Sequence, residues 1–314
     1  MGRRFKHITY ILLVLAMLIP AMETKAQQEP IYSQDIFSMQ TINPAYTGVW
    51  NTTSVSALAR KQWLGFDGAP STQSLLMEYS LEEEKIGLGL TIVNDNIGFE
   101  RTFNVFGDYS HRLDIRDDLH LRLGLKFGFN SYSNNLDEYT TYDPNYDSDP
   151  AFQGVLEQFF IPNFGIGALI YSDKFYAGLS LPKLLQNELT NDRNNFVSYA
   201  QMRHVYLQAG YIFSLANNIK FKPTINTGFV VGTPVNINLS ANFLLKEQVW
   251  VGVLYRVKSS FGISGQYKVN KNVCLGYAVD FSTSDLSRYN YGTHEVIVTY
   301  EINNNKRGRK IRYY

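Results

Sequence analysis

Apolar and polar residues alternate along most of the chain after the first 50 residues, and no stretch there has the 3.6-residue period of an amphipathic helix. In the segment PVNINLSANFLL, residues 234–245, Leu239 and Phe243 share one face with other apolar side chains, whereas Asn and Ser fill the opposite face. The segments at 119–132 and 219–230 repeat this pattern. Because successive side chains of a strand point to opposite faces, each segment predicts a β-strand with one apolar and one polar face.

The number and the length of these segments distinguish a membrane barrel from a soluble sheet. Strands of soluble proteins average about five or six residues, whereas a tilted strand needs about nine to eleven to cross a bilayer. Most of the segments reach the longer figure, and bacterial single-chain barrels have an even number of strands. We therefore expect an all-β fold, a transmembrane antiparallel β-barrel of about 14 strands of the outer-membrane type. The predicted strands are 54–63, 71–80, 85–94, 99–112, 118–130, 161–171, 174–181, 202–214, 218–230, 233–245, 248–257, 260–269, 272–282 and 291–302.

Aromatic residues recur near the ends of these segments. Membrane barrels carry girdles of aromatic side chains at the two interfaces between lipid and water. We expect the following residues to form such girdles: Trp63, Tyr79, Tyr109, Tyr132, Tyr171, Tyr267 and Tyr300.

The connections between the predicted strands differ in length, as outer-membrane barrels require, with short periplasmic turns and longer extracellular loops. If the first strand starts in the periplasm, the two longest connections, near 131–160 and 182–201, both face outside. The short sequences LEEE, YSDK, LANN and VNKN all fall on the periplasmic side. One outer connection, VGT, is also short. This alternation favours a membrane barrel over a soluble sandwich.

The first residues have the features of a secretory signal peptide. A basic N-terminus precedes an apolar run at 8–21, and small residues near Ala26 form a cleavage pattern. The segment that follows is expected in the barrel mouth or at the periplasmic rim. The expected parts of the chain are a signal peptide at 1–26, an N-terminal pre-barrel segment at 27–50, the β-barrel at 51–302 and a basic C-terminal tail at 303–314.

Charge and composition exclude several classes of function. The formal net charge is +1, so the chain lacks the basic excess of a nucleic-acid-binding protein. Cys274 is the single cysteine, which excludes an intrachain disulfide and a CxxC metal or redox site. The sequence DPNYDSD at 143–149 has the spacing that opens a calcium loop, but Ser148 stands where the turn glycine belongs. We expect no metal and no cofactor.

Catalytic motifs are also absent from the sequence. Neither a GxSxG nucleophile elbow nor an HExxH zinc motif occurs. An embedded lipid hydrolase would need a histidine beside a nucleophile, and the histidines of the mature chain lie on separate predicted strands. We therefore expect no enzymatic activity. These histidines are His111, His120, His204 and His294.

The stretch RKQWLGFDGAPSTQS, residues 60–74, places Gly, Asp and Pro in the first outer connection, where turns favour them. Its hydroxyl groups and Asp67 have no base or metal partner in the sequence, so we expect no catalytic role. Trp63 is expected at the membrane interface, and Phe66 either folds inward or contacts a partner.

Four blocks of sequence carry a family resemblance: YSQDIFSMQTINPAYTG, RKQWLGFDGAPSTQSL, KIGLGLTIVNDNIG and DPAFQ…FFIPNFGIGALIYSDKFYAGLSLPKLL. In this order they resemble the PorP/SprF family of outer-membrane proteins, from the type IX secretion and gliding machinery of Bacteroidota. The resemblance covers nearly the whole mature chain. The matching motif residues, interpreted as structural or as possible partner contacts, are Asn43, Pro44, Ala45, Gly48, Trp63, Gly65, Phe66, Gly68, Ala69 and Pro70.

The resemblance implies a non-enzymatic barrel embedded in outer-membrane lipid. Its implied partners are a periplasmic ring lipoprotein, peptidoglycan-linked components and a secreted or surface-attached cargo protein. A general porin or small-solute transporter is the alternative function, because the polar faces carry cations such as Arg122 and Lys126. Many other polar-face positions are Gly or Asn, so an open lumen and a plugged lumen both agree with the sequence.

Overall fold

The computed structural model describes residues 30–50, 52–81, 85–135, 155–190 and 197–303. The predicted signal peptide, the DPNYDSD sequence and residues 304–314 of the predicted basic tail lie outside these ranges.

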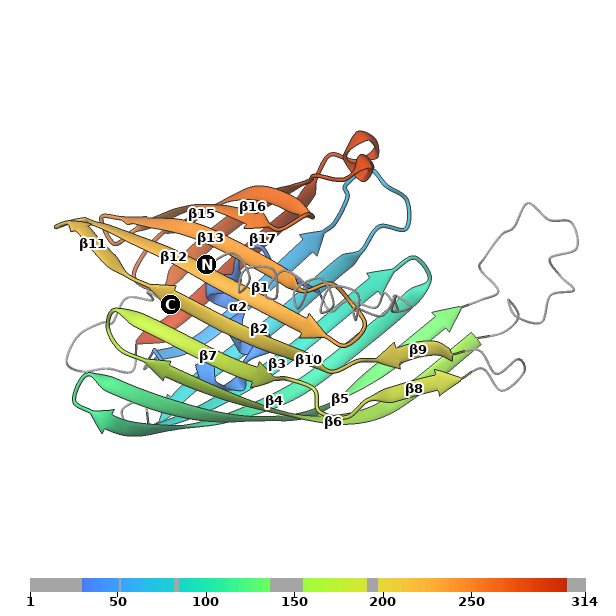
Figure 1. Ribbon diagram of the computed structural model, residues 1–314, viewed down its shortest axis with the longest axis horizontal. Coiled ribbons are helices and arrows are strands. Elements are labelled where there is room, and N and C mark those ends of the chain that lie inside the picture. Colours follow the sequence, from blue (N-terminus) through green and yellow to red (C-terminus); the bar gives the residue numbers. More distant parts are fainter. Residues whose placement is uncertain (1–29, 51, 82–84, 136–154, 191–196, 304–314) are drawn as a thin grey trace, which may run out of the picture.

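The described chain forms a closed antiparallel β-barrel of 14 strands, which confirms the predicted fold class (Figure 1). None of its helices is long and apolar enough to span a bilayer. The barrel strands are β1 (Thr52–Lys61), β2 (Ser71–Leu81), β3 (Ile86–Ile97), β4 (Glu100–Arg116), β5 (Leu119–Asn135), β6 (Val155–Tyr171), β7 (Phe175–Leu181), β10 (His204–Tyr211), β11 (Phe213–Ala216), β12 (Ile219–Val230), β13 (Asn236–Leu245), β14 (Val249–Arg256), β15 (Ser260–Lys268), β16 (Val273–Ser282) and β17 (Thr293–Asn303).

Hydrogen bonds between strands that follow one another in the chain build the barrel, and β1 closes it by pairing with β17. Both β10 and β11 pair with β12, so they form one barrel strand that is interrupted at Ile212. A separate hairpin, β8 (Asn187–Thr190) with β9 (Val197–Gln201), extends beyond the barrel (Figure 1). It lies in a connection that the sequence pattern left without strands.

The two faces of the barrel wall have the chemistry expected in a membrane. Leu125 and Phe127 on β5 are 55% and 57% exposed on the outer surface. Their neighbours Arg122 and Lys126 face the lumen and are buried. A soluble sheet would bury its apolar face instead, so the outer surface suits hydrocarbon and the lumen holds the polar groups.

The predicted aromatic girdles are correct for some residues and wrong for others. Tyr79, Tyr267 and Tyr300 are about half exposed on the outer surface. Tyr132 and Tyr171, in contrast, point inward and are only 1% and 2% exposed. These two rings pack on buried residues inside the barrel, which gives them an apolar environment away from lipid.

The two ends of the barrel differ. At the end where β1 begins and β17 finishes, every connection is a short turn, and we call it the turn end. At the opposite loop end, the connections include the long segments after β5 and after β7. The strands β4, β5 and β6 each have 17 residues, longer than the rest. The long connections therefore all lie at one end, as expected, although the loop-end connections 98–99, 231–235 and 257–259 are also short.

Residues 30–50, here called the plug, lie inside the lumen rather than at the rim of the barrel. They contain the helix α2 (Asp35–Ile42) and the 3-10 helix η1 (Pro44–Tyr46), and Figure 1 shows α2 enclosed by strands. Pro30 lies near Val230 and Pro234 at the loop end. Gly48 lies against the backbone of Gly87 at the turn end. The plug thus runs along the lumen from the loop end to the turn end.

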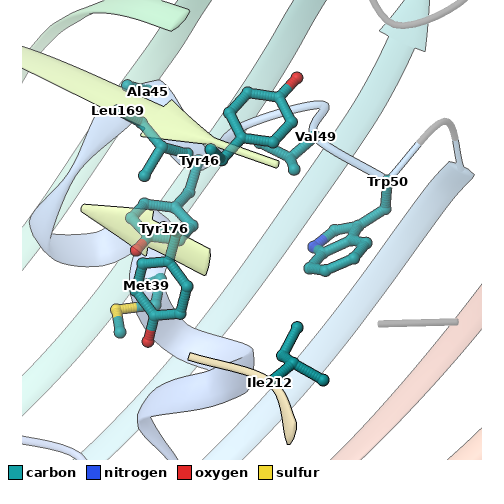
Figure 2. Packing of buried hydrophobic residues seen from close by; sticks show 9 residues of the cluster. Met39, Ala45, Tyr46, Val49, Trp50, Leu169, Tyr176 and Ile212 are labelled. Atoms are coloured by element: carbon teal, nitrogen blue, oxygen red, sulfur yellow. The ribbon is translucent and has the colours of Figure 1, made fainter. Parts of the chain in front are cut away.

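A buried apolar cluster joins the plug to the wall (Figure 2). Tyr46 of the plug meets Tyr176 of β7 edge to face, with the ring centroids 5.8 Å apart. Ile212 also belongs to the cluster, at the interruption between β10 and β11. Aromatic pairs in this geometry add stability beyond the area they bury.

Candidate functional site

One carboxylate of the barrel wall holds the beginning of the plug. Glu295 on β17 accepts the backbone N–H groups of Ser33 and Gln34, both at 2.9 Å. The guanidinium of Arg60 on β1 lies 3.7 Å away, and both charged side chains are almost completely buried. The Ser33 hydroxyl also donates to Asp280 on β16. Because N–H groups before a helix have no partner within it, Glu295 fixes the start of α2 against the wall.

Neighbouring plug residues bond to other strands. The hydroxyls of Tyr32 and Ser74 lie 2.7 Å apart. Burial raises the pKa of Tyr32, so its hydroxyl stays neutral. The side-chain amide of Gln266 on β15 donates to that of Gln34 at 2.9 Å.

The middle of the plug lies against glycines of the wall. The amide group of Asn43 donates to Ala168 O and to Gln208 Oε1, and its oxygen accepts the N–H of Ala45 at the start of η1. A β-carbon at Gly124 would overlap the backbone of η1, and one at Gly167 would overlap Asn43. The absence of side chains at these positions lets the plug backbone approach the strands directly.

Two further cations bind the plug backbone. Arg122 on β5 donates to Thr47 O at 2.9 Å and to Gly48 O at 3.2 Å, the carbonyls that follow η1. Lys126, four residues further along the same face of β5, pairs with Asp108 at 2.8 Å and donates to Gln40 O at 3.2 Å. Positive charge at the carbonyl end of a helix is favourable, so the wall cations stabilise the seated plug.

The plug fills the lumen at this level. Wall residues on four different strands, Arg122, Lys222, Gln208 and Glu295, all have exposed fractions of 0%. Water therefore has no access to these four side chains. A cavity of about 50 Å³ remains between the plug and the wall near the loop end, lined by Tyr32, Thr41 and Asn226 among others.

The loop end carries a second arrangement, made from two connections. Residues 62–70 join β1 to β2, and residues 283–292, with the 3-10 helix η6 (Asp285–Tyr289), join β16 to β17. The N–H of Leu64 donates to Gly292 O and the N–H of Tyr291 donates to Leu64 O, both at 2.8 Å. These bonds make the two loops a single surface.

The family-motif residues fall into two groups that the structure does not bring together. Asn43, Pro44, Ala45 and Gly48 belong to the plug and are buried. The other six lie in the loop at 62–70, at the loop end of the barrel.

Within that loop the motif residues have different surroundings. Trp63 is half-buried with a φ of 42°, and lines a cavity with Arg60 and Thr293. Phe66 is 47% exposed, so it does not fold inward, and contact with a partner is the expectation that still stands. Gly65, Gly68, Ala69 and Pro70 complete the turn: both glycines have positive φ, and both other residues are buried.

The described residues contain no group of three or more His, Cys, Asp or Glu side chains that could hold a metal ion. Three of the four histidines in the described ranges have hydrogen-bond partners: His120 with Asp114, His204 with Met202 O and His294 with the Tyr277 hydroxyl.

Sequence reasoning missed Glu295 and Asp108, which seat the plug, and it associated Arg122 and Lys126 with a polar lumen rather than with the plug. Each one stands at a lumen-facing position of a predicted strand, where polar residues are common in any barrel. A charged residue next to wall glycines was the available signal, but it does not tell a plugged lumen from an open one.

These features define the class: a membrane β-barrel of the outer-membrane type whose lumen is closed by its own N-terminal segment. Residues 24–300 match the family described as type IX secretion system membrane protein PorP/SprF. The chain belongs to this family, and the resemblance seen in the sequence is confirmed. No curated protein sequence matches the chain significantly.

Several solved structures are similar to the barrel. The CymD monoaromatic hydrocarbon channel has 9% identity and a TM-score of 0.48, over 86% of this chain and 92% of that one. The toluene transporter TbuX of Ralstonia pickettii has 10% identity and a TM-score of 0.49, over 90% and 96%. The KdgM porin has 12% identity and a TM-score of 0.36, over 79% and 99%.

Proposed function

We propose that this protein is an outer-membrane component of the type IX secretion and gliding machinery, which docks periplasmic ring lipoproteins and supports export or surface retention of secreted proteins. The observation that carries the proposal is the family match over residues 24–300. The apolar outer surface of the barrel supports a place in the membrane. Export would use a signal peptide cleaved after residue 26, and no enzymatic step belongs to the proposed role.

The orientation follows from the connections. Outer-membrane barrels have short turns in the periplasm and longer loops outside, so the turn end is proposed to face the periplasm. Ring lipoproteins and peptidoglycan-linked components would then meet the short turns, and cargo would meet the loops. The plug is a poor docking surface for the ring, because residues 43–50 are all buried. The expectation from the sequence was a segment in the barrel mouth or at the periplasmic rim, and the plug lies deeper, along the lumen.

A deletion strain tests the function. We expect loss of exported and surface-displayed type IX cargo, with recovery on expression of the intact gene. Normal export and display in the deletion strain would contradict the proposal. Crosslinking from single cysteines in the turns, in a Cys274→Ser background, tests the docking: ring lipoproteins should be captured from the turns and not from the loop at 62–70.

The sequence left a general porin as the alternative, and the seated plug weighs against it. A diffusion porin needs a continuous aqueous path, whereas Arg122, Lys222 and Glu295 are completely buried around the plug. Purified protein in a planar bilayer is therefore expected to be silent. A stable open channel in the wild-type protein would favour the porin.

A further inference from the structure

At the loop end, beside the joined loops, lies a cavity of about 160 Å³. Its charged lining consists of Arg60, Arg256 and Lys258 against a single carboxylate, Asp280. Hydroxyl groups of several serines and Thr293 complete the polar lining. Glu295, which lies outside the lining, neutralises Arg60, so Arg256 and Lys258 against Asp280 leave a net positive charge. The cavity has room for a carboxylate and a few water molecules.

Ser260 supplies an independent sign that this cavity takes a ligand. Its side chain lines the cavity, the residue is 6% exposed, and its Oγ has no hydrogen-bond partner among the described residues. A buried hydroxyl without a partner is costly, and an acceptor group such as a carboxylate oxygen would satisfy it.

An apolar surface continues from the cavity. Trp63 and Leu286 line the cavity wall, and Leu64, Phe66, Tyr289 and Tyr291 follow on the same two joined loops. The two tyrosines are 71% and 76% exposed, and Leu64 and Phe66 are 41% and 47% exposed. Exposed apolar groups that cluster in this way mark a site of interaction. We call these six residues the aromatic shelf.

The aromatic shelf stands away from the lipid-facing band on the β1 side of the barrel. The last outward positions of β17, β1 and β2 at the loop end are polar: Lys61 pairs with His294 on one side and with Ser71 on the other. Toward the turn end the outward residues become apolar, as at Val296 and Leu75. Leu64 lies beyond Lys61 and pairs through its backbone with Tyr291 and Gly292, which precede His294 at the loop end. The shelf near Leu64 therefore faces the aqueous side of this polar row.

We propose that the cavity and the aromatic shelf together bind an acidic segment of a polypeptide, in which a carboxylate enters the cavity and neighbouring apolar side chains pack on the shelf. Aliphatic residues of the shelf favour a polypeptide over a sugar, since Leu64 and Leu286 offer sugar hydroxyls no partner. The strand residues that line the cavity, such as Arg60, Arg256 and Asp280, are lumen-facing, which separates it from lipid phosphates outside the wall. The inference deepens the proposed function, because it rests on cargo meeting the loop end and defines the chemistry of that cargo.

The chain offers a matched pair of lysines for the test. Lys258, in the turn between β14 and β15, lines the cavity at the loop end with a φ of 59°. Lys246, in the turn between β13 and β14, lies at the turn end with a φ of 49°. Both are exposed, so charge reversal at either position disturbs folding equally little. Tyr289→Ala and Tyr255→Ala form a second pair, on the shelf and on the lipid-facing surface.

The probe is a fluorescein-labelled peptide of alternating Asp and Phe, with a counterpart in which Asn replaces each Asp, measured by anisotropy on the purified barrel in detergent. We expect the acidic peptide to bind at least about tenfold more tightly than the amide peptide at low salt, with the difference shrinking as salt is added. Lys258→Glu should weaken binding about tenfold and Tyr289→Ala about fivefold, whereas Lys246→Glu and Tyr255→Ala should leave it unchanged.

Equal binding of both peptides, or equal losses for Lys258→Glu and Lys246→Glu, would overturn the proposal. Displacement of the acidic peptide by stoichiometric lipopolysaccharide would also overturn it and assign the cavity to lipid phosphate. Cargo display, measured in cells, is a separate readout. If the deletion strain displays cargo normally, the proposed function fails while the peptide result stands. If the deletion strain loses display and the peptide does not bind, only the acidic-segment inference fails.

Discussion

Replacing Glu295 by Gln is expected to release the plug and open the lumen. The carboxylate is completely buried and accepts the N–H groups of Ser33 and Gln34 at 2.9 Å each. It also neutralises the buried guanidinium of Arg60. A glutamine has nearly the same shape, but its amide has one acceptor oxygen and one NH₂ group. The oxygen can accept from only one of the two plug N–H groups, and the NH₂ group faces the other, donor against donor. The substitution therefore removes the anchor without creating a cavity.

The magnitude follows from these contacts. A hydrogen bond to a charged group contributes about 1.5–3 kcal/mol, and one of the two is lost while the other becomes a weaker neutral bond. Removal of one partner of a buried ion pair costs about 3–5 kcal/mol. This figure and the hydrogen-bond figure overlap, because both include the loss of the negative charge of Glu295. We expect the seated plug to lose about 3 kcal/mol relative to the displaced plug. The ratio of closed to open barrels then falls by about 100-fold.

Conductance of the purified barrel in a planar bilayer measures this ratio. The wild-type protein should be silent and Glu295→Gln should show openings, whereas Glu301→Gln, on the same face of β17 nearer the turn end, should resemble the wild type. Continued silence of Glu295→Gln would refute the role assigned to this carboxylate.

Three further changes probe the rest of the fold. Gly124→Val forces a side chain into the plug backbone and should lower the free energy of unfolding by about 1–3 kcal/mol, measured as a lower unfolding temperature. Gly265→Val should not, because a β-carbon there lies 3.9 Å from its nearest neighbour, Trp250 O. Asn163→Ala removes an amide that bonds to the backbone of 184–185 and to the Gln201 side chain, so hydrogen exchange there should accelerate; Asn94→Ala, on the outer surface, should leave it unchanged. Val253→Arg, on a lipid-facing residue that is 56% exposed, should cost about 2–4 kcal/mol in urea titrations of vesicle-inserted protein, and a smaller cost would contradict the membrane position of β14.

The barrel was largely predictable because its signal is local. Each strand alternates apolar and polar positions over about ten neighbouring residues. This pattern can be recognised without knowing which strand pairs with it. The β8–β9 hairpin escaped prediction because its strands have only four and five residues, too short for a period to show. The inward positions of Tyr132 and Tyr171 escaped for another reason, since position near a strand end does not tell which face of the wall a ring occupies.

The plug and the loop-end surface were beyond local reasoning. The eight residues of α2 are too few to display a helical period, and its anchor Glu295 lies 262 residues from Ser33 along the chain. Leu64 and Gly292 likewise meet only because β1 closes the barrel against β17. The family motif indicated that both regions matter, but it gave no position in space for either.

By itself the sequence determined the strand order, the two faces of the wall and the family, because these depend on residue types at short separations. Only the tertiary structure decided that the lumen is closed and that two loops form one surface at its outer end. The physical reason is that both depend on contacts between distant parts of the chain, where a carboxylate such as Glu295 finds its backbone partners only after the barrel has closed around them.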